Sequence, residues 1–147
     1  MKSIIQGHRA IALDTCFWIY HFENHPDYQK LTTQILADVS AGRVHAYVSE
    51  LTLLELLVRP LQLERQDIAD EYEMLLTHFP NLDLVPISRD ILLQAASIRA
   101  KYGLRAPDTI IVASGIMRGA TLAITNDEKW KRVEEIKVVC LSDFLSV

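Results

Sequence analysis

Short apolar runs alternate with longer stretches of helical periodicity along the chain. The apolar runs contain mainly Val, Ile, Leu and Ala without strict alternation, which is typical of parallel strands buried on both faces. The predicted strands are Ala10–Asp14, Val44–Ser49, Leu82–Ile87, Thr121–Thr125 and Lys137–Leu141. The predicted helices are Thr15–Phe22, Pro26–Ala41, Glu50–Arg59, Glu64–Phe79, Ser88–Tyr102 and Pro107–Arg118. We therefore expect a three-layer α/β/α fold around a central parallel sheet of about five strands.

Residues that cap or stop helices support these boundaries. Ser49 and Ser88 are suited to cap the helices that follow them, and Gly103 is a typical helix stop. Pro107 fits the first turn of the last predicted helix. No repeat, low-complexity stretch or interdomain linker interrupts the pattern, so we expect residues 1–147 to form one domain.

The composition is that of an ordinary globular protein. Half of the 147 residues are hydrophobic and 23% are charged, which argues against extensive disorder. The formal net charge is −4, so the total charge does not by itself indicate a nucleic-acid binder. Gln6, His8 and Arg9 interrupt any signal-peptide pattern, and no apolar run reaches the roughly 20 residues that span a bilayer. We expect a soluble, cytoplasmic protein with no membrane partner.

Four acidic residues stand where strands and helices are expected to meet. They are Asp14 at the end of the first strand, Glu55 within a helix, Asp108 at a helix start and Asp127 after the fourth strand. In open parallel sheets, ligands collect beyond the carboxyl ends of the strands. Carboxylates gathered there repel one another unless protons or a divalent cation compensate them, and oxygen ligands suit Mg²⁺ or Mn²⁺. The pattern therefore favours metal-assisted phosphodiester chemistry.

Of the four acids, Glu55 is the one whose sequence neighbours most clearly favour a functional role. Helical geometry places its side chain on the same side as Leu51, Leu54 and Val58, which we expect to face the core. A carboxylate on a core-facing stripe must be paired, protonated or bound to metal. The structural alternative is an ion pair with Arg59, four residues further along the helix.

The other acids also have structural explanations. Asp108 lies in a first helical turn, where the helix dipole favours a carboxylate, and Asp127 ends a segment with the composition of a turn. Asp14 could simply end its strand or cap the next helix. Two other known uses of a strand-end aspartate are excluded. An aspartate-nucleophile phosphatase needs a second aspartate where Cys16 stands, and a receiver domain needs an acidic pair where Leu13 stands.

Taken together, these segments resemble the PIN-domain ribonucleases, especially the toxins of VapC-type toxin–antitoxin pairs. The matching stretches follow the family's order and are Leu13–Thr15, Ser49–Leu56, Pro107–Ser114 and Ile124–Asp127. The resemblance implies a PIN-like fold and a Mg²⁺- or Mn²⁺-dependent endoribonuclease that leaves 5′-phosphate and 3′-hydroxyl ends. It implies that the metal-site and catalytic acids are Asp14, Glu55, Asp108 and Asp127, with Thr15 and Thr125 as supporting polar groups.

Partners follow from the same resemblance and from surface chemistry. An RNA substrate, a cognate antitoxin and a second copy of the chain are the expected partners, with the apolar segments Phe17–Tyr20 and Leu51–Val58 as candidate surfaces. Trp130 is the preferred residue for stacking unpaired bases, whereas Trp18 is expected in the core. Two clusters of cations flank the predicted site and could bind phosphates of the RNA: Arg99, Lys101 and Arg105 before Asp108, and Lys129, Lys131 and Arg132 after Asp127. At least half of these six residues are expected to be ordinary solvated surface.

Two further interpretations remain open beside the toxin ribonuclease. The first is a catalytically idle PIN-like module that binds RNA or a protein partner, and the presence of all four acids argues against it. The second is a structural fold whose carboxylates are compensated by salt bridges, without metal. Whether the RNA is transfer, ribosomal or messenger does not follow from the sequence.

Overall fold

The computed structural model describes residues 3–145 and contains one five-stranded parallel sheet. The strands are β1 (Ala10–Leu13), β2 (His45–Ser49), β3 (Leu82–Val85), β4 (Leu122–Thr125) and β5 (Lys137–Cys140). Their order across the sheet is β3-β2-β1-β4-β5, and every neighbouring pair is parallel. The predicted parallel sheet of five strands is therefore confirmed.

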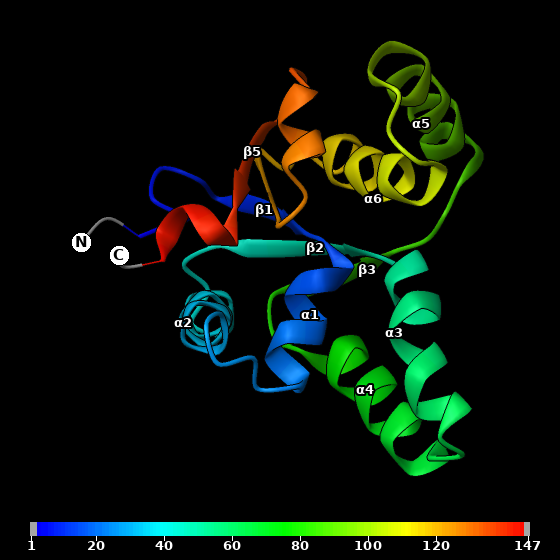
Figure 1. Cartoon of the computed structure of the whole chain (residues 1–147). Coiled ribbons are helices and arrows are strands. Elements are labelled where there is room, and N and C mark those ends of the chain that lie inside the picture. The colour runs from blue at the N-terminus through cyan, green and yellow to red at the C-terminus, as the bar shows by residue number, and fades with distance from the viewer. Residues whose placement is uncertain (1–2, 146–147) are drawn as a thin grey trace.

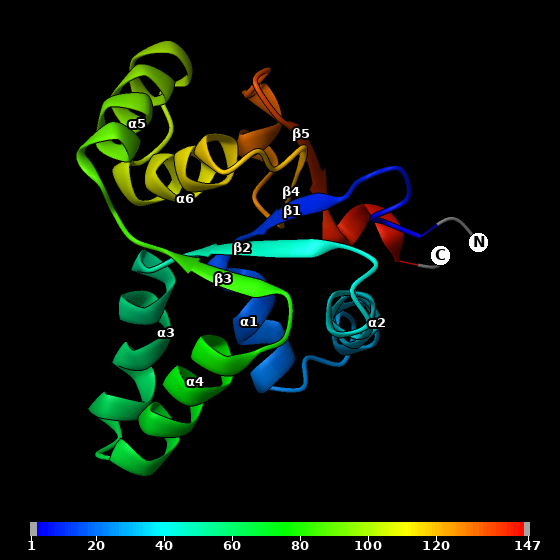
Figure 2. The same cartoon turned by 180° about the vertical axis from the view of Figure 1, so that it is seen from behind.

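Helices cover both faces of this sheet. The α-helices are α1 (Thr15–Phe22), α2 (Gln29–Ser40), α3 (Leu51–Gln62), α4 (Gln66–His78), α5 (Arg89–Tyr102) and α6 (Ala106–Met117), and two short 3₁₀ helices are η1 (Glu128–Arg132) and η2 (Leu141–Phe144). Helices α1 to α4 lie on one face, whereas α5 and α6 lie on the other (Figure 1). The reverse view shows the same division (Figure 2). This is the expected α/β/α arrangement.

Local signals explain where several helices begin and end. The Ser88 hydroxyl accepts a hydrogen bond from the Ile91 amide at the start of α5, and Gly103 ends that helix with a left-handed φ of 71°. The start of α2 was predicted too early, because the chain first turns through Pro26–Tyr28. Helix α3 extends past its predicted end at Arg59 and includes Pro60 in its last turns.

The sheet separates two apolar cores. On β1, Ile11 and Leu13 point into the core beneath α1 to α4, and Ala12 points to the opposite core beneath α6. The small residues at this second contact have a steric reason, because a Cβ added to Gly115 would lie 2.6 Å from the Cβ of Ala12. Helix α6 therefore approaches β1 closely and carries Asp108 to the edge of the sheet.

Two predictions about side-chain burial are wrong. Leu54 and Val58 are 63% and 44% exposed, so the stripe predicted to face the core is largely open to solvent. Trp130 is completely buried in the core beneath α6 and cannot stack on a base, while Trp18 is buried as expected. Among the described residues, no helix combines the length and the apolar character that crossing a bilayer requires.

Candidate metal centre at the carboxyl edge of the sheet

Four predicted acids follow the carboxyl ends of three adjacent strands or lie in the helix beside them. Asp14 directly follows β1, Glu55 lies in α3 just after β2, and Asp127 comes shortly after β4. Strands β2, β1 and β4 are neighbours in the sheet, so the segments that leave them begin side by side. Asp108 joins this edge from the first turn of α6, which packs on β1 and β2.

Asp14 is the most tightly held of these acids. It is the N-cap of α1, and its Oδ1 accepts a hydrogen bond of 2.7 Å from the Thr15 amide. Its Oδ2 accepts a second bond of 2.7 Å from the Thr125 hydroxyl and a longer contact of 3.6 Å from the Cys16 thiol. With only 8% of the residue exposed, the carboxylate has one fixed orientation, set by donors from both ends of the chain.

The surroundings of Asp14 disfavour its negative charge. Burial raises the pKa of this carboxyl group from 3.8 to about 6, although the Thr125 and Thr15 hydrogen bonds act in the opposite direction. The charges of Asp108 and Glu55 raise the pKa further. These two acids therefore lie close enough to Asp14 to repel it, and a proton or a cation is needed to compensate the group.

A chain of hydroxyl groups holds Glu55 beside Asp14. The Thr15 hydroxyl donates to Glu55 Oε1 at 2.8 Å, and the Thr15 oxygen lies 2.9 Å from the Thr52 hydroxyl oxygen. Because Thr15 has a single hydroxyl proton, Thr52 must be the donor in the second bond. Thr52 was not predicted from the sequence, although a residue three positions before Glu55 on α3 lies on the same side of the helix as Glu55. No ion pair joins Glu55 to Arg59 in the described part of the chain, so Glu55 has its hydroxyl partner instead.

Asp127 and Asp108 differ in how they are held. Asp127 caps η1 by accepting from the Lys129 amide at 3.0 Å, and its own amide donates to the Thr125 hydroxyl oxygen at 3.1 Å. Asp108 is only 7% exposed and accepts a hydrogen bond from Arg105 Nε at 3.2 Å. Thr125 therefore links Asp14 to Asp127, while Asp108 is the acid with a cation beside it.

Most of the cations predicted to bind phosphate interact instead with other groups of the protein. Lys131 pairs with Glu128 and Asp143, and Arg99 donates to the Leu104 carbonyl oxygen. Lys101 lies 3.8 Å from a Glu135 carboxylate oxygen, and Arg132 donates to the Tyr102 carbonyl oxygen. In the described residues, Arg105 is the member of these clusters whose side chain donates a hydrogen bond to one of the four acids.

The residues present suit a hydrated hard cation rather than a closed cage. Within residues 3–145, no three His, Cys, Asp or Glu side chains converge closely enough to enclose an ion. Mg²⁺ usually keeps several waters and is held by one or two carboxylates, so a full protein cage is not required. The Asp14 carboxylate, whose pKa is raised mainly by burial and further by two neighbouring acids, has the chemistry of such a site.

Comparison with known proteins places this fold in a family. The sequence pattern of the PIN domain matches residues 11–136, and the chain belongs to the PIN domain family. No curated protein matches it by sequence. The fold is shared with toxin chains that were solved as parts of toxin–antitoxin complexes.

Three solved structures illustrate the likeness. One is a toxin–antitoxin complex from Klebsiella pneumoniae, with a TM-score of 0.69 and 22% identity over 90% of this chain and 97% of that chain. A second is VapBC2 from Rickettsia felis bound to a promoter DNA fragment, with a TM-score of 0.71 and 18% identity over 89% and 98%. A third is FitAcB from Neisseria gonorrhoeae, with a TM-score of 0.67 and 18% identity over 90% and 98%.

Proposed function

We propose that this protein is a metal-dependent endoribonuclease and the toxin component of a type II toxin–antitoxin pair. The observation that carries the proposal is the buried Asp14 carboxylate, which is oriented by Thr15 and Thr125 and repelled by Asp108 and Glu55. A group arranged in this way needs a proton or a cation, and the PIN domain family to which the chain belongs typically binds Mg²⁺. The fold shared with VapC and FitB toxins supports the assignment to toxins.

Each acid has a separate role in this proposal. Asp14, Asp108 and Glu55 would hold a Mg²⁺ or Mn²⁺ ion, directly or through its waters, and Asp127 would act through a water. When bound, such an ion supplies positive charge to the phosphodiester and lowers the pKa of water. Thr125 and Thr15 keep the Asp14 oxygens aimed at the site, and Thr15 does the same for Glu55.

The reaction proposed is hydrolysis of an RNA phosphodiester. Water adds its oxygen to phosphorus while the bond between phosphorus and the 3′ oxygen breaks. One water proton ends on the 3′ oxygen, which gives a 3′-hydroxyl end and a 5′-phosphate end. The chain's own contribution is to fix the carboxylates before substrate arrives, since Asp14 and Glu55 are held by hydrogen bonds in the free protein.

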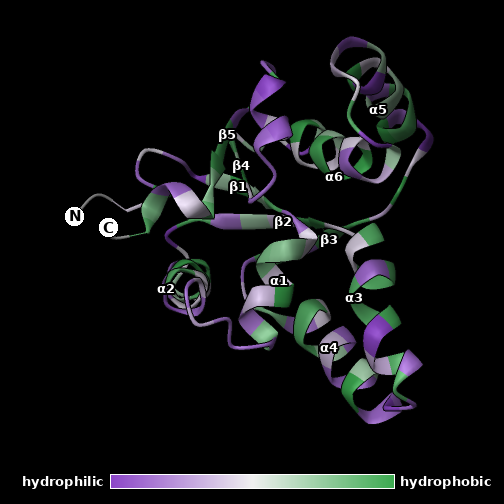
Figure 3. Ribbon diagram, viewed as in Figure 1, coloured by the Kyte–Doolittle hydropathy of each residue, from purple (hydrophilic) through white to green (hydrophobic). Residues whose placement is uncertain are grey.

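An exposed apolar stripe supports the proposed protein partners. Leu54, Val58 and Leu61 recur on one side of α3 and are 63%, 44% and 47% exposed. Helices α3 and α4 extend away from the sheet and still carry hydrophobic segments there (Figure 3). Such a surface is suited to an antitoxin or to a second copy of the chain. The relatives solved as toxin–antitoxin complexes point in the same direction.

A catalytically idle module is the second candidate, and one observation favours it. Arg105 already compensates Asp108, and the acids form no closed cage in the described residues. In this alternative the protein would bind RNA without cutting it. The cation at Asp108 would then be a permanent substitute for metal.

Metal-dependent stability tests the proposed metal centre. Thermal unfolding would be followed in EDTA and in Mg²⁺ or Mn²⁺ for the wild type, Asp14→Asn and the control Asp90→Asn. Asp90 is an exposed acid in the first turn of α5, so its loss changes net charge equally without touching the site. At a metal concentration 100 times Kd, the wild type and Asp90→Asn should gain about 2.7 kcal/mol, and Asp14→Asn should gain little. An equal gain in all three proteins would remove Asp14 from the metal site.

Cleavage of a labelled single-stranded RNA separates the enzyme from the idle module. The wild type should cut the RNA in Mn²⁺ and stop cutting when EDTA is added, while Asp14→Asn should bind RNA without cutting. Digestion of the downstream fragment by an exonuclease that requires a 5′-phosphate would identify that end. RNA that is bound but left intact by the wild type, in metal, would favour the idle module.

A further inference from the structure

Arg105 lies beside Asp108, one of the four acids that form the acid cluster (Asp14, Glu55, Asp108 and Asp127). It is the N-cap residue of α6, and its Nε donates to Asp108 Oδ2 at 3.2 Å. The Arg105 side chain is 76% exposed, whereas the Asp108 side chain is 11% exposed. A solvent-exposed cation thus stands directly in front of a buried carboxylate.

More than one acid acts on this guanidinium. The hydrogen bond to Asp108 and the charge of Asp108 are the main causes of a raised pKa for Arg105, and Asp127 and Glu55 raise it further. These acids come from α6, from the segment after β4 and from α3. Because arginine stays protonated at all working pH values, Arg105 contributes a constant positive charge near these acids.

Most of the hydrogen-bonding capacity of Arg105 is unused within residues 3–145. Only its Nε donates to a protein acceptor, which leaves the two terminal amino groups without a protein partner there. The planar guanidinium matches phosphate oxygens with parallel N–H donors. Its exposure lets these groups reach a ligand without rearranging the core.

We propose that Arg105 is the built-in counter-cation of the acid cluster, which releases Asp108 when a divalent ion binds and uses its free N–H groups to hold a phosphate of the RNA. This inference rests on the proposed ribonuclease function and assigns one substrate contact within it. Arg105 competes with metal for Asp108 and attracts the polyanionic substrate. Arg105 therefore weakens metal binding but strengthens RNA binding.

Removing the charge at Arg105 should therefore strengthen metal binding and weaken RNA binding. Arg105→Gln should raise the affinity for Mn²⁺ about two- to fivefold, the range expected from an exposed ion pair. It should also lower the salt dependence of binding to a labelled single-stranded RNA, because each lost phosphate contact reduces the logarithmic slope by about 0.7. Arg105→Lys keeps the charge, so its Mn²⁺ affinity should stay near that of the wild type.

Arg118→Gln is the matched control. Arg118 is the exposed C-cap residue of the same helix and makes no ion pair in the described residues. With 1.5 Å of rise per residue it lies roughly 20 Å from Arg105, which exceeds the Debye length of about 8 Å at physiological salt. The same change of net charge at Arg118 should leave both measured affinities unaltered.

Mn²⁺ affinity would be measured by calorimetry, and RNA binding by fluorescence anisotropy across a salt series in EDTA, which prevents cleavage. Higher Mn²⁺ affinity with a shallower RNA slope in Arg105→Gln alone would support the proposal. Unchanged values, or a joint loss of both affinities, would overturn it and leave Arg105 as a structural cap. Failure of the ribonuclease proposal itself is distinguishable, because the wild type would then bind no Mn²⁺ or would leave RNA intact in metal.

Discussion

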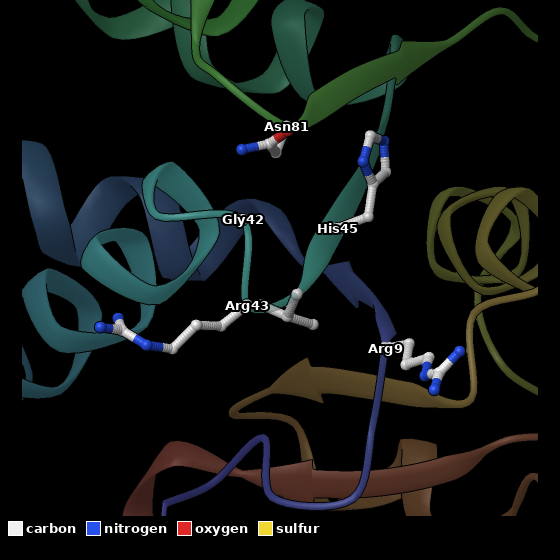
Figure 4. A pocket seen from close by; sticks show the side chains of 6 residues that line it. Arg9, Gly42, Arg43, His45 and Asn81 are labelled. Atoms are coloured by element: carbon white, nitrogen blue, oxygen red, sulfur yellow. The ribbon is translucent and has the colours of Figure 1, made fainter.

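The two edges of the same sheet carry opposite chemistry. At the carboxyl edge, Asp14 and Asp108 are 8% and 7% exposed and their charges repel each other. At the amino edge, basic and polar residues line a cavity of about 270 Å³, to which Arg9, Arg43 and His45 contribute. The side chains around this cavity do not converge, because Arg9 and Arg43 point to opposite sides (Figure 4).

The difference lies in how charge is compensated. At the amino edge, Arg43 pairs with Asp38 at 2.9 Å and His45 pairs with Asp83 at 2.9 Å, on partly solvated side chains. At the carboxyl edge, the bonds that Asp14 accepts come from neutral hydroxyl, amide and thiol groups, which leaves its charge uncompensated. Chemistry is therefore expected where buried charge lacks a counter-charge, rather than at the amino-edge cavity.

The largest effect in this comparison should be a change in protein stability with pH, caused by protonation of Asp14. The pKa of Asp14 is 3.8 ordinarily and about 6 in the folded protein, so the folded state holds a proton that the unfolded state has lost between these values. In the metal-free protein, the contribution of Asp14 to stability should be most favourable below pH 3.8, fall as pH rises to about 6, and then level off. The difference between the two pKa values corresponds to about 3 kcal/mol.

Urea unfolding in EDTA between pH 4 and pH 7 would measure this effect, with Asp14→Asn as the comparison. The variant carries no ionisable group at this position, so it should lose this pH dependence and exceed the wild type in stability near neutral pH. Identical pH profiles for the two proteins would mean that the carboxyl edge compensates its charge as fully as the amino edge does.

A smaller effect is expected when one donor to Asp14 is removed. Thr125→Val keeps the shape of the side chain but deletes the hydroxyl that donates to Asp14 Oδ2 at 2.7 Å. Losing this positioning group should weaken Mn²⁺ binding about 10- to 100-fold, as measured by calorimetry. The exposed Thr33 of α2 provides the control substitution Thr33→Val. Equal Mn²⁺ affinity in both variants would show that Thr125 does not position the carboxylate.

The smallest effect should come from the amino edge. Arg43→Gln breaks the ion pair with Asp38, in which the arginine side chain is 66% exposed, so unfolding should become easier by less than about 1 kcal/mol. Mn²⁺ affinity and RNA cleavage should not change, because the pair lies at the other end of the strands. A larger loss of RNA binding in Arg43→Gln than in Arg105→Gln would move the RNA-binding surface to the amino edge.

Local sequence patterns were sufficient for most of the fold. The parallel strands and their helices follow from apolar runs and helical periodicity, which depend on residues close together in the chain. The same patterns placed Asp14 at a strand end and Asp108 in a first helical turn, where the structure has them.

The errors share one physical cause. Periodicity shows that Leu54 and Val58 share a side of α3 with Glu55, but it cannot show that this part of the helix extends beyond the sheet that would cover it. Trp130 was predicted to stack on unpaired bases, yet η1 folds the indole under α6. Burial is decided by which elements meet, and that information is not local.

The sequence by itself determined the elements, their parallel pairing and the acids that end or begin them. Only the tertiary structure decided that β2, β1 and β4 are neighbours, that Thr125 reaches Asp14 across 111 residues, and that Thr15 reaches Glu55 across 40. It also decided that the exposed Arg105 pairs with the buried Asp108. Helix and strand patterns record short-range preferences, whereas the partners of a buried charge depend on how distant segments pack against one another.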